Sequence, residues 1–152
     1  MRVNKILLIV LLVAVAGFAV YRLVREHFAS EEARIKKLIR EVEKDFENKE
    51  LKRCLVVVSE EYSDDLGHAT RDELEDDLRL LFQVARKIRA KVQDVSISIR
   101  GDEADITLTA TGTATTTFGD ISFRHELGFT RFSIIARQEH GRWKVFRVQG
   151  VN

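Results

Sequence analysis

The stretch ISFRHELGFTRFSIIAR, residues 121–137, decides the fold that the sequence predicts. Its apolar side chains lie at odd positions as far as Phe129 and at even positions from Phe132 onward. Alternation with a period of two is typical of a β-strand, and one extra residue near Thr130 would explain the change of face. We therefore expect one long strand that bends at a β-bulge and curves its sheet.

Three shorter segments show the same alternation, and turn residues separate the strands. Arg100-Gly101-Asp102-Glu103 predicts a hairpin, while Gly119-Asp120 and Glu139-His140-Gly141 supply the other two turns. We expect a four-stranded antiparallel meander whose concave side is filled by helices, by a ligand or by both. The other expected strands cover residues 95–99, 106–110 and 143–148.

Three helices are predicted before the sheet. The first begins at the capping residue Ser30 and ends near Asn48, and no proline or glycine separates it from the apolar segment before it. The second covers residues 51–62. The third opens with the capping box of residues 70–73, and its apolar side chains follow at steps of four and three over residues 74–92. One stripe of this third helix is expected to be buried on the sheet along its length.

Residues 6–21 form an uninterrupted apolar run with basic residues on both sides. As a helix this run is roughly 24 Å long. A bilayer core is about 30 Å thick, so spanning it requires a few flanking residues and the snorkelling of Lys5 and Arg22. We therefore expect a single transmembrane helix through residues 3–24.

A cleaved signal peptide is the alternative, because Ala14-Val15-Ala16 has the small-x-small form of a cleavage site. The apolar run continues to Tyr21, which favours an uncleaved signal-anchor. A strict count of basic residues on the two sides would leave the domain in the cytoplasm. We expect the domain on the extracytoplasmic, periplasmic side, because a short basic stretch before an apolar run is what export machinery reads.

Composition limits the chain to one domain and an appendage. It has 152 residues, no proline, 45% hydrophobic and 32% charged residues. We assign residues 1–28 to the membrane anchor and residues 29–152 to the domain. The anchor holds four basic residues and one acidic residue, so the domain has a net charge of about −2. A nucleic-acid-binding domain is expected to be basic, so this function is excluded.

The order of these elements resembles the nuclear-transport-factor-2-like superfamily, also called the cystatin-like α+β cone. The resemblance covers roughly residues 30–150 and includes Glu61-Tyr62-Ser63-Asp64, Gly101-Asp102-Glu103-Ala104 and His140-Gly141-Arg142-Trp143-Lys144-Val145. It implies three helices packed on a curved, cone-shaped sheet. The superfamily includes isomerase-like and cyclase-like enzymes, small-molecule binders and protein-interaction domains, so the fold alone does not choose a function.

An enzyme of the isomerase or cyclase kind needs a carboxylate or histidine base inside the cone. The inward parity of the predicted strands contains no Asp or Glu, and His125 is its only ionisable side chain before the expected bulge. Tyr62, on the apolar face of the second helix, is a candidate donor of a hydrogen bond. The ligand-pocket residues that we predict are Tyr62, Phe82, Phe123, His125 and Trp143.

Neither a metal nor a cofactor is expected. Acidic residues gather around His68, between residues 60 and 77, but without the spacing of a calcium loop, so they indicate a solvated surface. The single cysteine, Cys54, lies on an apolar helical face, where a buried and inert thiol is expected.

The sequence thus predicts a membrane-tethered, non-enzymatic binding domain for a small apolar ligand or an envelope protein partner. One alternative is an isomerase-like or cyclase-like enzyme that uses His125 and Tyr62, and catalysis would require these two side chains to share a solvent-reachable cavity. The other alternative is an envelope assembly scaffold that acts as a homodimer.

Overall fold

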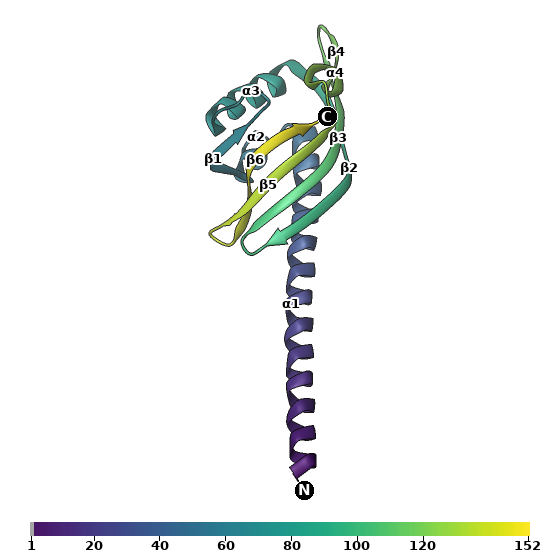
Figure 1. Cartoon of the computed structure of the whole chain (residues 1–152). Coiled ribbons are helices and arrows are strands. Elements are labelled where there is room, and N and C mark those ends of the chain that lie inside the picture. The colour runs from purple at the N-terminus through teal and green to yellow at the C-terminus, as the bar shows by residue number, and fades with distance from the viewer. Residues whose placement is uncertain (1) are drawn as a thin grey trace. The chain divides into compact units, whose positions relative to one another are not determined.

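The computed structural model describes the backbone of residues 2–152 and the side chains of residues 10 and 12–152. The chain divides into two compact units, residues 1–34 and residues 35–152. Over the described residues it has an α+β fold with four helices and a curved, mixed sheet of six strands (Figure 1). The elements are α1 (Arg2–Glu47), α2 (Leu51–Val56), β1 (Val58–Asp64), α3 (Arg71–Val84), β2 (Ala85–Arg100), β3 (Glu103–Thr116), β4 (Gly119–Ser122), α4 (Phe123–Leu127), β5 (Arg131–Glu139) and β6 (Arg142–Val151).

The first unit is helical and carries many exposed apolar side chains. Among the residues that the structure describes, no helix is long and apolar enough to cross a membrane. The transmembrane helix expected through residues 3–24 is therefore not supported, and residues 3–9 and 11 of that span lie outside the described side chains. The exposed large apolar side chains here include Val10, Leu12, Val13, Val15, Phe18, Val20, Tyr21, Leu23, Val24 and Phe28.

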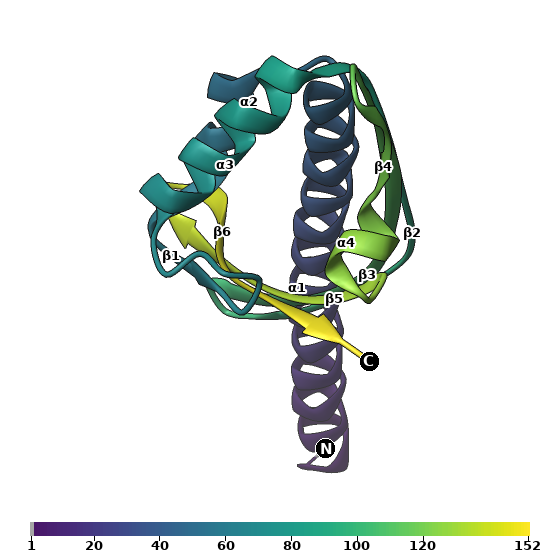
Figure 2. The same ribbon diagram turned by 90° about the horizontal axis from the view of Figure 1, so that it is seen from above.

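The strands follow the order β1-β6-β5-β3-β2, and β4 pairs with β3 beside this path. β1 and β6 run parallel, with Val58 opposite Val145, whereas the other pairs are antiparallel. The predicted hairpin is confirmed as β2 and β3, which turn at Gly101 and Asp102. The expected meander of four antiparallel strands is wrong, because β1 adds a parallel edge strand and β4 branches from β3. Figure 2 shows how the sheet curves round the end of α1.

Two of the predicted helices end earlier than the pattern indicated. α2 ends at Val56 and α3 ends at Val84, where the sequence predicted helix as far as Tyr62 and Val92. The residues beyond these ends form β1 and the first half of β2. A spacing of four, as between Val58 and Tyr62, keeps two side chains on one face of a helix and equally on one face of a strand.

α3 begins as predicted but does not lie along the sheet. The Glu73 N–H donates to Thr70 Oγ1 at 3.3 Å, which confirms the predicted cap. Glu73 Oε2 accepts at 2.7 Å from the N–H of Ala69, one residue before Thr70, instead of from Thr70 itself. α3 packs against α2, β1 and β2, and none of its side chains is buried. The prediction of a stripe buried along the whole helix is therefore wrong.

The predicted long strand of residues 121–137 is divided by a helix. β4 ends at Ser122, α4 takes the next five residues, and Gly128 ends α4 with a left-handed φ of 77°. This helical turn, rather than a bulge at Thr130, produces the change in apolar parity. The sheet does contain an irregularity in β2, where the pairing register with β3 shifts and Asp94 has a φ of 52°.

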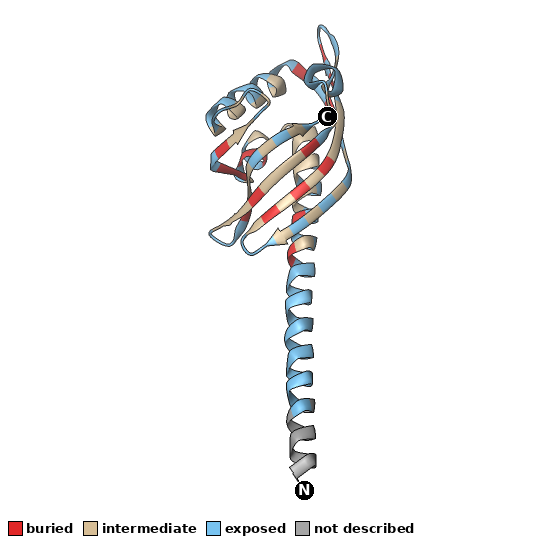
Figure 3. Ribbon diagram, viewed as in Figure 1, coloured by how far each residue is buried: buried red, intermediate tan, exposed pale blue. Residues whose placement is uncertain are grey.

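The core of the second unit consists of two clusters. The larger cluster packs Ile35 of α1, which is 1% exposed, against β3, β5 and β6. The smaller cluster joins β2 and β3, with aromatic side chains of α1, α3 and α4 beside it. Figure 3 shows the buried residues crossing neighbouring strands. The buried members are Ile35, Ala104, Ile106, Leu108, Phe132, Ala136 and Trp143 in the larger cluster, and Ala85, Ile88 and Ala114 in the smaller.

Candidate ligand-binding site

The structure brings only two of the five predicted pocket residues together. Phe82 of α3 and Phe123 of α4 both pack on Phe46 of α1, with ring centroids 5.6 and 5.8 Å from it. Trp143 is 7% exposed within the larger core cluster. Tyr62 is 5% exposed on β1. Phe46 was not among the predicted pocket residues, although its helical spacing from Val42 in α1 could have indicated it.

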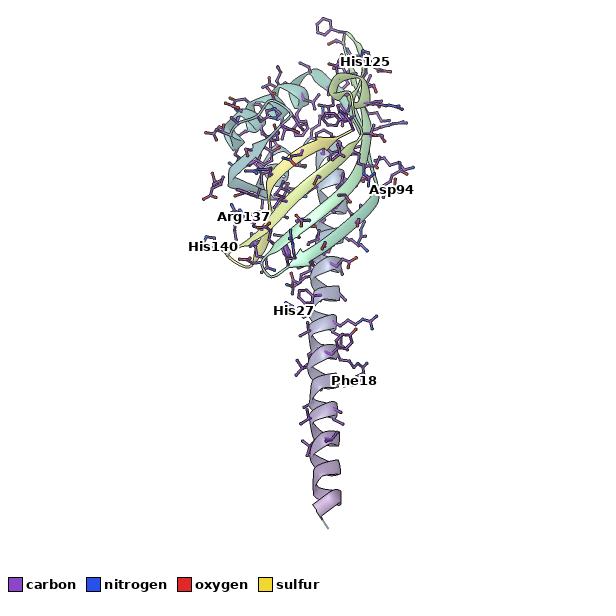
Figure 4. All side chains as sticks on the ribbon, in the orientation of Figure 1. Phe18, His27, Asp94, His125, Arg137 and His140 are labelled. Atoms are coloured by element: carbon purple, nitrogen blue, oxygen red, sulfur yellow. The ribbon has the colours of Figure 1, made fainter. Side chains whose placement is uncertain are left out.

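His125 does not lie where the strand parity predicted. It is an exposed residue of α4, near the end of the domain at which β4 lies (Figure 4). Tyr62 belongs to the edge strand β1, and β6 and β5 separate β1 from β3, the strand that α4 contacts. The two side chains proposed for an isomerase-like or cyclase-like site therefore come from different parts of the sheet.

The hydroxyl of Tyr62 instead joins a network that the sequence analysis missed. It donates to Asp64 Oδ2 at 2.6 Å, and His68 Nδ1 lies 2.7 Å from the same oxygen. His68 Nε2 lies 2.8 Å from Asp77 Oδ2 on α3. Asp64 Oδ1 accepts from the N–H groups of Leu66 and His68 at 2.9 and 2.8 Å. The Asp-x-x-Gly-His sequence of this loop is the signal that could have indicated it.

This network holds the loop between β1 and α3 in one conformation and does not create a catalytic base. Both nitrogens of His68 lie against carboxylate oxygens, which only accept, so the protonated imidazole donates from both and has no free nitrogen to act as a base. Burial alone would lower the pKa of His68, but the hydrogen bonds with Asp64 and Asp77 outweigh it and raise the pKa. Burial would likewise raise the pKa of Asp64, but its hydrogen bonds from Tyr62, His68 and Leu66 lower it.

The His68 imidazolium is expected to make stability depend on pH. Because its folded-state pKa is raised above 6.5, its contribution is complete below about pH 6.5 and is lost as the pH rises through the raised pKa. The folded-state pKa of Asp64 is lowered below 3.8, so its contribution is complete above about pH 4 and is lost on acidification. The difference in unfolding free energy between the wild type and His68→Gln should therefore be largest at about pH 4–6.5 and shrink at alkaline pH. Urea unfolding of both proteins across this range measures it, and a constant difference would contradict the prediction.

Cys54 is buried in α2, as the sequence predicts. Burial, reinforced by the nearby Asp45 carboxylate, raises the pKa of its thiol to about 11. A thiol with this pKa is a poor nucleophile at neutral pH. No group of three or more metal-ligating side chains occurs among the described residues.

The apolar stripe of α3 is only partly covered. Leu74, Leu78 and Leu81 follow at steps of four and three, and each is half-buried. Leu81 borders the smaller core cluster, whereas Leu74 and Leu78 belong to neither cluster. Phe129, Ile134 and Val148 of the larger cluster are also half-buried. The apolar side chains of α3 are therefore covered incompletely by the described residues.

Two surface hollows are lined by none of the predicted pocket residues. One, of about 340 Å³, lies over β2, β3 and the start of α4. The other, of about 240 Å³, lies between α1 and β2 and is lined by Lys36, Ile39, Arg40, Glu43, Val92 and Val95. In the second hollow, Glu43 Oε2 accepts from the Val92 N–H at 3.0 Å. This bond gives a partner to a backbone donor on the open side of the edge strand β2.

Known structures of low sequence identity share this fold. A protein of Novosphingobium aromaticivorans, described provisionally as a scytalone dehydratase, superposes with a TM-score of 0.68 at 12% identity, over 79% of this chain and 82% of its own. A provisional dehydratase of the nuclear-transport-factor-2-like family from Streptomyces avermitilis gives 0.63 at 13% identity, over 81% and 98%. A nuclear-transport-factor-2-like protein of unknown function from Pseudomonas putida gives 0.63 at 10% identity, over 80% and 85%.

No protein-family model matches the chain, and no curated protein matches it by sequence. The structural likeness therefore establishes the nuclear-transport-factor-2-like fold and leaves the activity to be argued from the site.

Proposed function

We propose that the domain binds a small apolar ligand without catalysing a reaction, and that the stripe of α3 forms part of the binding surface. The observation that carries this proposal is that α3 has an apolar stripe and no buried side chain. A helix normally buries such a stripe against its own domain. An apolar ligand that covers Leu74 and Leu78 would complete this burial.

The arrangement of ionisable groups favours binding over catalysis. His125 is exposed on α4, and the hydroxyl of Tyr62 is used by Asp64. The histidine that does lie near Tyr62 is His68, and both of its ring nitrogens are within hydrogen-bond distance of carboxylates. A general base needs an accepting atom within hydrogen-bond reach of its substrate, and neither histidine offers one on the α3 stripe.

Energy transfer from Trp143, the single tryptophan, to a dansyl-labelled alkyl chain tests the proposal on the full chain. Leu78→Gln places a polar group on the stripe and should reduce transfer several-fold. Leu80→Gln is the matched control, because Leu80 is 59% exposed on the same helix and lies off the stripe. Equal transfer in the two variants would show that the probe binds apolar surface nonspecifically and would exclude the proposed site. A protein partner would instead appear as a specific cross-link from position 78 in intact cells.

We also infer membrane attachment through the first unit, with the domain in the periplasm. The support is its series of large exposed apolar side chains and the basic residues that flank the apolar run. Retention of the full chain in the membrane fraction after alkaline carbonate extraction tests the attachment. Digestion of the domain by protease added to intact spheroplasts tests its location, and protection would contradict it. Homodimer formation stays a prediction, which the mass of the detergent-solubilised chain would check.

A further inference from the structure

The hollow of about 340 Å³ is lined by cations and hydroxyl groups. It is formed by two neighbouring strands, the end of β4 and the first turn of α4. Among its lining residues there is no aspartate or glutamate. These residues are Arg89, Ala90, Lys91, Thr111, Gly112, Thr113, Ser122 and Arg124.

The strand register places these side chains on one face. Arg89 pairs with Thr113 and Lys91 with Thr111 across β2 and β3, and Thr113 pairs with Ser122 across β3 and β4. Arg89 and Lys91 have the opposite parity to the core residue Ile88, so they project from the convex side of the sheet. The hollow is therefore separate from the α3 stripe.

A break in the sheet creates the hollow. β3 pairs with β4 at residues 113–116 and with β5 at residues 103–109, so residues 110–112 lie between the two ladders. The chain leaves the sheet at this break to form α4. Phe123 begins α4 and packs against Gly112, where a Cβ atom would lie 2.7 Å from its ring and 2.5 Å from the Arg89 carbonyl oxygen. Gly112 thus fixes Phe123, and with it the neighbouring Arg124 at the rim.

Gly112→Ala is expected to lower the unfolding free energy because the methyl group overlaps the Arg89 backbone and the Phe123 ring. Overpacking of this kind destabilises a protein, so the urea concentration at the midpoint of unfolding should fall. Gly17→Ala is a suitable control, since a Cβ there has no neighbour within 4 Å. Urea unfolding, monitored by Trp143 fluorescence, measures the stability of both variants. A Gly112→Ala protein as stable as Gly17→Ala would contradict this packing.

The three cations of the hollow are not neutralised by the described residues. Arg89, Lys91 and Arg124 are exposed, and the structure shows no ion pair for any of them within residues 12–152. By contrast, Arg34, Arg79 and other cations of the chain do have carboxylate partners. Unpaired like charges repel one another, so a bound anion would relieve this repulsion.

We propose that this hollow binds a phosphate group. Guanidinium groups recognise phosphate by paired N–H donors, and Lys91 adds a third positive charge. The donors come from β2, β3, β4 and α4, and three positive charges around one hollow suit a phosphate dianion better than a singly charged carboxylate. A volume of about 340 Å³ also leaves room for the part of the ligand that carries the phosphate.

Calorimetric titration of the full chain in neutral detergent with pyrophosphate tests the proposal. The wild type should bind one equivalent, and Arg89→Gln/Arg124→Gln should lose at least fivefold in affinity, because it removes two of the three cations that line the hollow. Lys52→Gln/Arg142→Gln is the matched control, because it removes two exposed cations outside the hollow. An equal loss in both double variants, or no binding by the wild type, would overturn the proposal.

Two further titrations distinguish the source of the phosphate. Inorganic phosphate alone represents a soluble compound, and phosphatidic acid mixed into the same neutral micelles represents a lipid headgroup. Tighter binding in either arm supports the phosphate site and identifies its source. Citrate provides the chemical control, and citrate that binds as tightly as pyrophosphate would overturn the assignment to phosphate. None of these outcomes depends on the dansyl probe, so this site and the apolar site on α3 can fail independently.

Discussion

Replacing Asp64 with alanine is expected to lower the unfolding free energy by about 3–5 kcal/mol, because it leaves buried partners of a carboxylate unpaired. The Asp64 side chain is 0% exposed and holds four donors, namely the Tyr62 hydroxyl, His68 Nδ1 and the N–H groups of Leu66 and His68. Removing the carboxylate leaves the Tyr62 hydroxyl and His68 Nδ1 without their acceptor, although His68 Nε2 keeps Asp77. Urea unfolding at pH 6, followed by Trp143 fluorescence, measures the effect.

Two further variants show whether the network carries this loss. Glu60→Ala removes a carboxylate that is 84% exposed and should change stability by no more than about 0.5 kcal/mol. Asp64→Ala combined with His68→Gln should lower the unfolding free energy by less than the sum of the single changes. The second substitution removes the imidazole whose Nδ1 lost its acceptor in Asp64→Ala. Additive losses, or an Asp64→Ala protein as stable as Glu60→Ala, would contradict a coupled network.

Ile35→Ala is expected to cost about 2–5 kcal/mol, because it opens a cavity in the larger core cluster. Ile35 is 1% exposed and is the fully buried residue that α1 contributes to that cluster, beside the partly buried Leu38 and Ile39. Ile35→Val removes only one methylene and should cost about 0.5–1.5 kcal/mol. Lys37→Ala, at an exposed position two residues on, should be nearly neutral. The ranking of the three unfolding free energies tests the packing of α1, and equal losses at Ile35 and Lys37 would contradict it.

The sequence predicted correctly the elements whose signals are local. The cap formed by Thr70 and Glu73 and the turn at Gly101 depend on neighbouring residues, and both occur in the structure. The strand β1 could not be recognised in this way, because the four-residue spacing of Val58 and Tyr62 fits either a helix or a strand. Its partner β6 lies at the other end of the domain sequence, and no local pattern specifies that pairing.

The site was harder to predict than the fold for the same reason. His125 was placed inside the sheet by parity, but parity has no meaning across the helical turn of α4. The residues of the cationic hollow are visible in the sequence as Arg89, Lys91 and Arg124, yet only the strand register shows that they surround one space. The Asp64 and His68 pair is local, and a closer reading of the loop could have found it.

The parallel pairing of β1 with β6 has a consequence for biosynthesis. β1 has no other strand partner in the sheet, and Ser59 on β1 is hydrogen-bonded to Glu139, 80 residues further along the chain. A growing chain on the ribosome therefore carries β1 as an open edge while all the intervening elements emerge. β1 can pair only when β6 has left the exit tunnel, so the sheet is completed only after residues 142–151 have emerged.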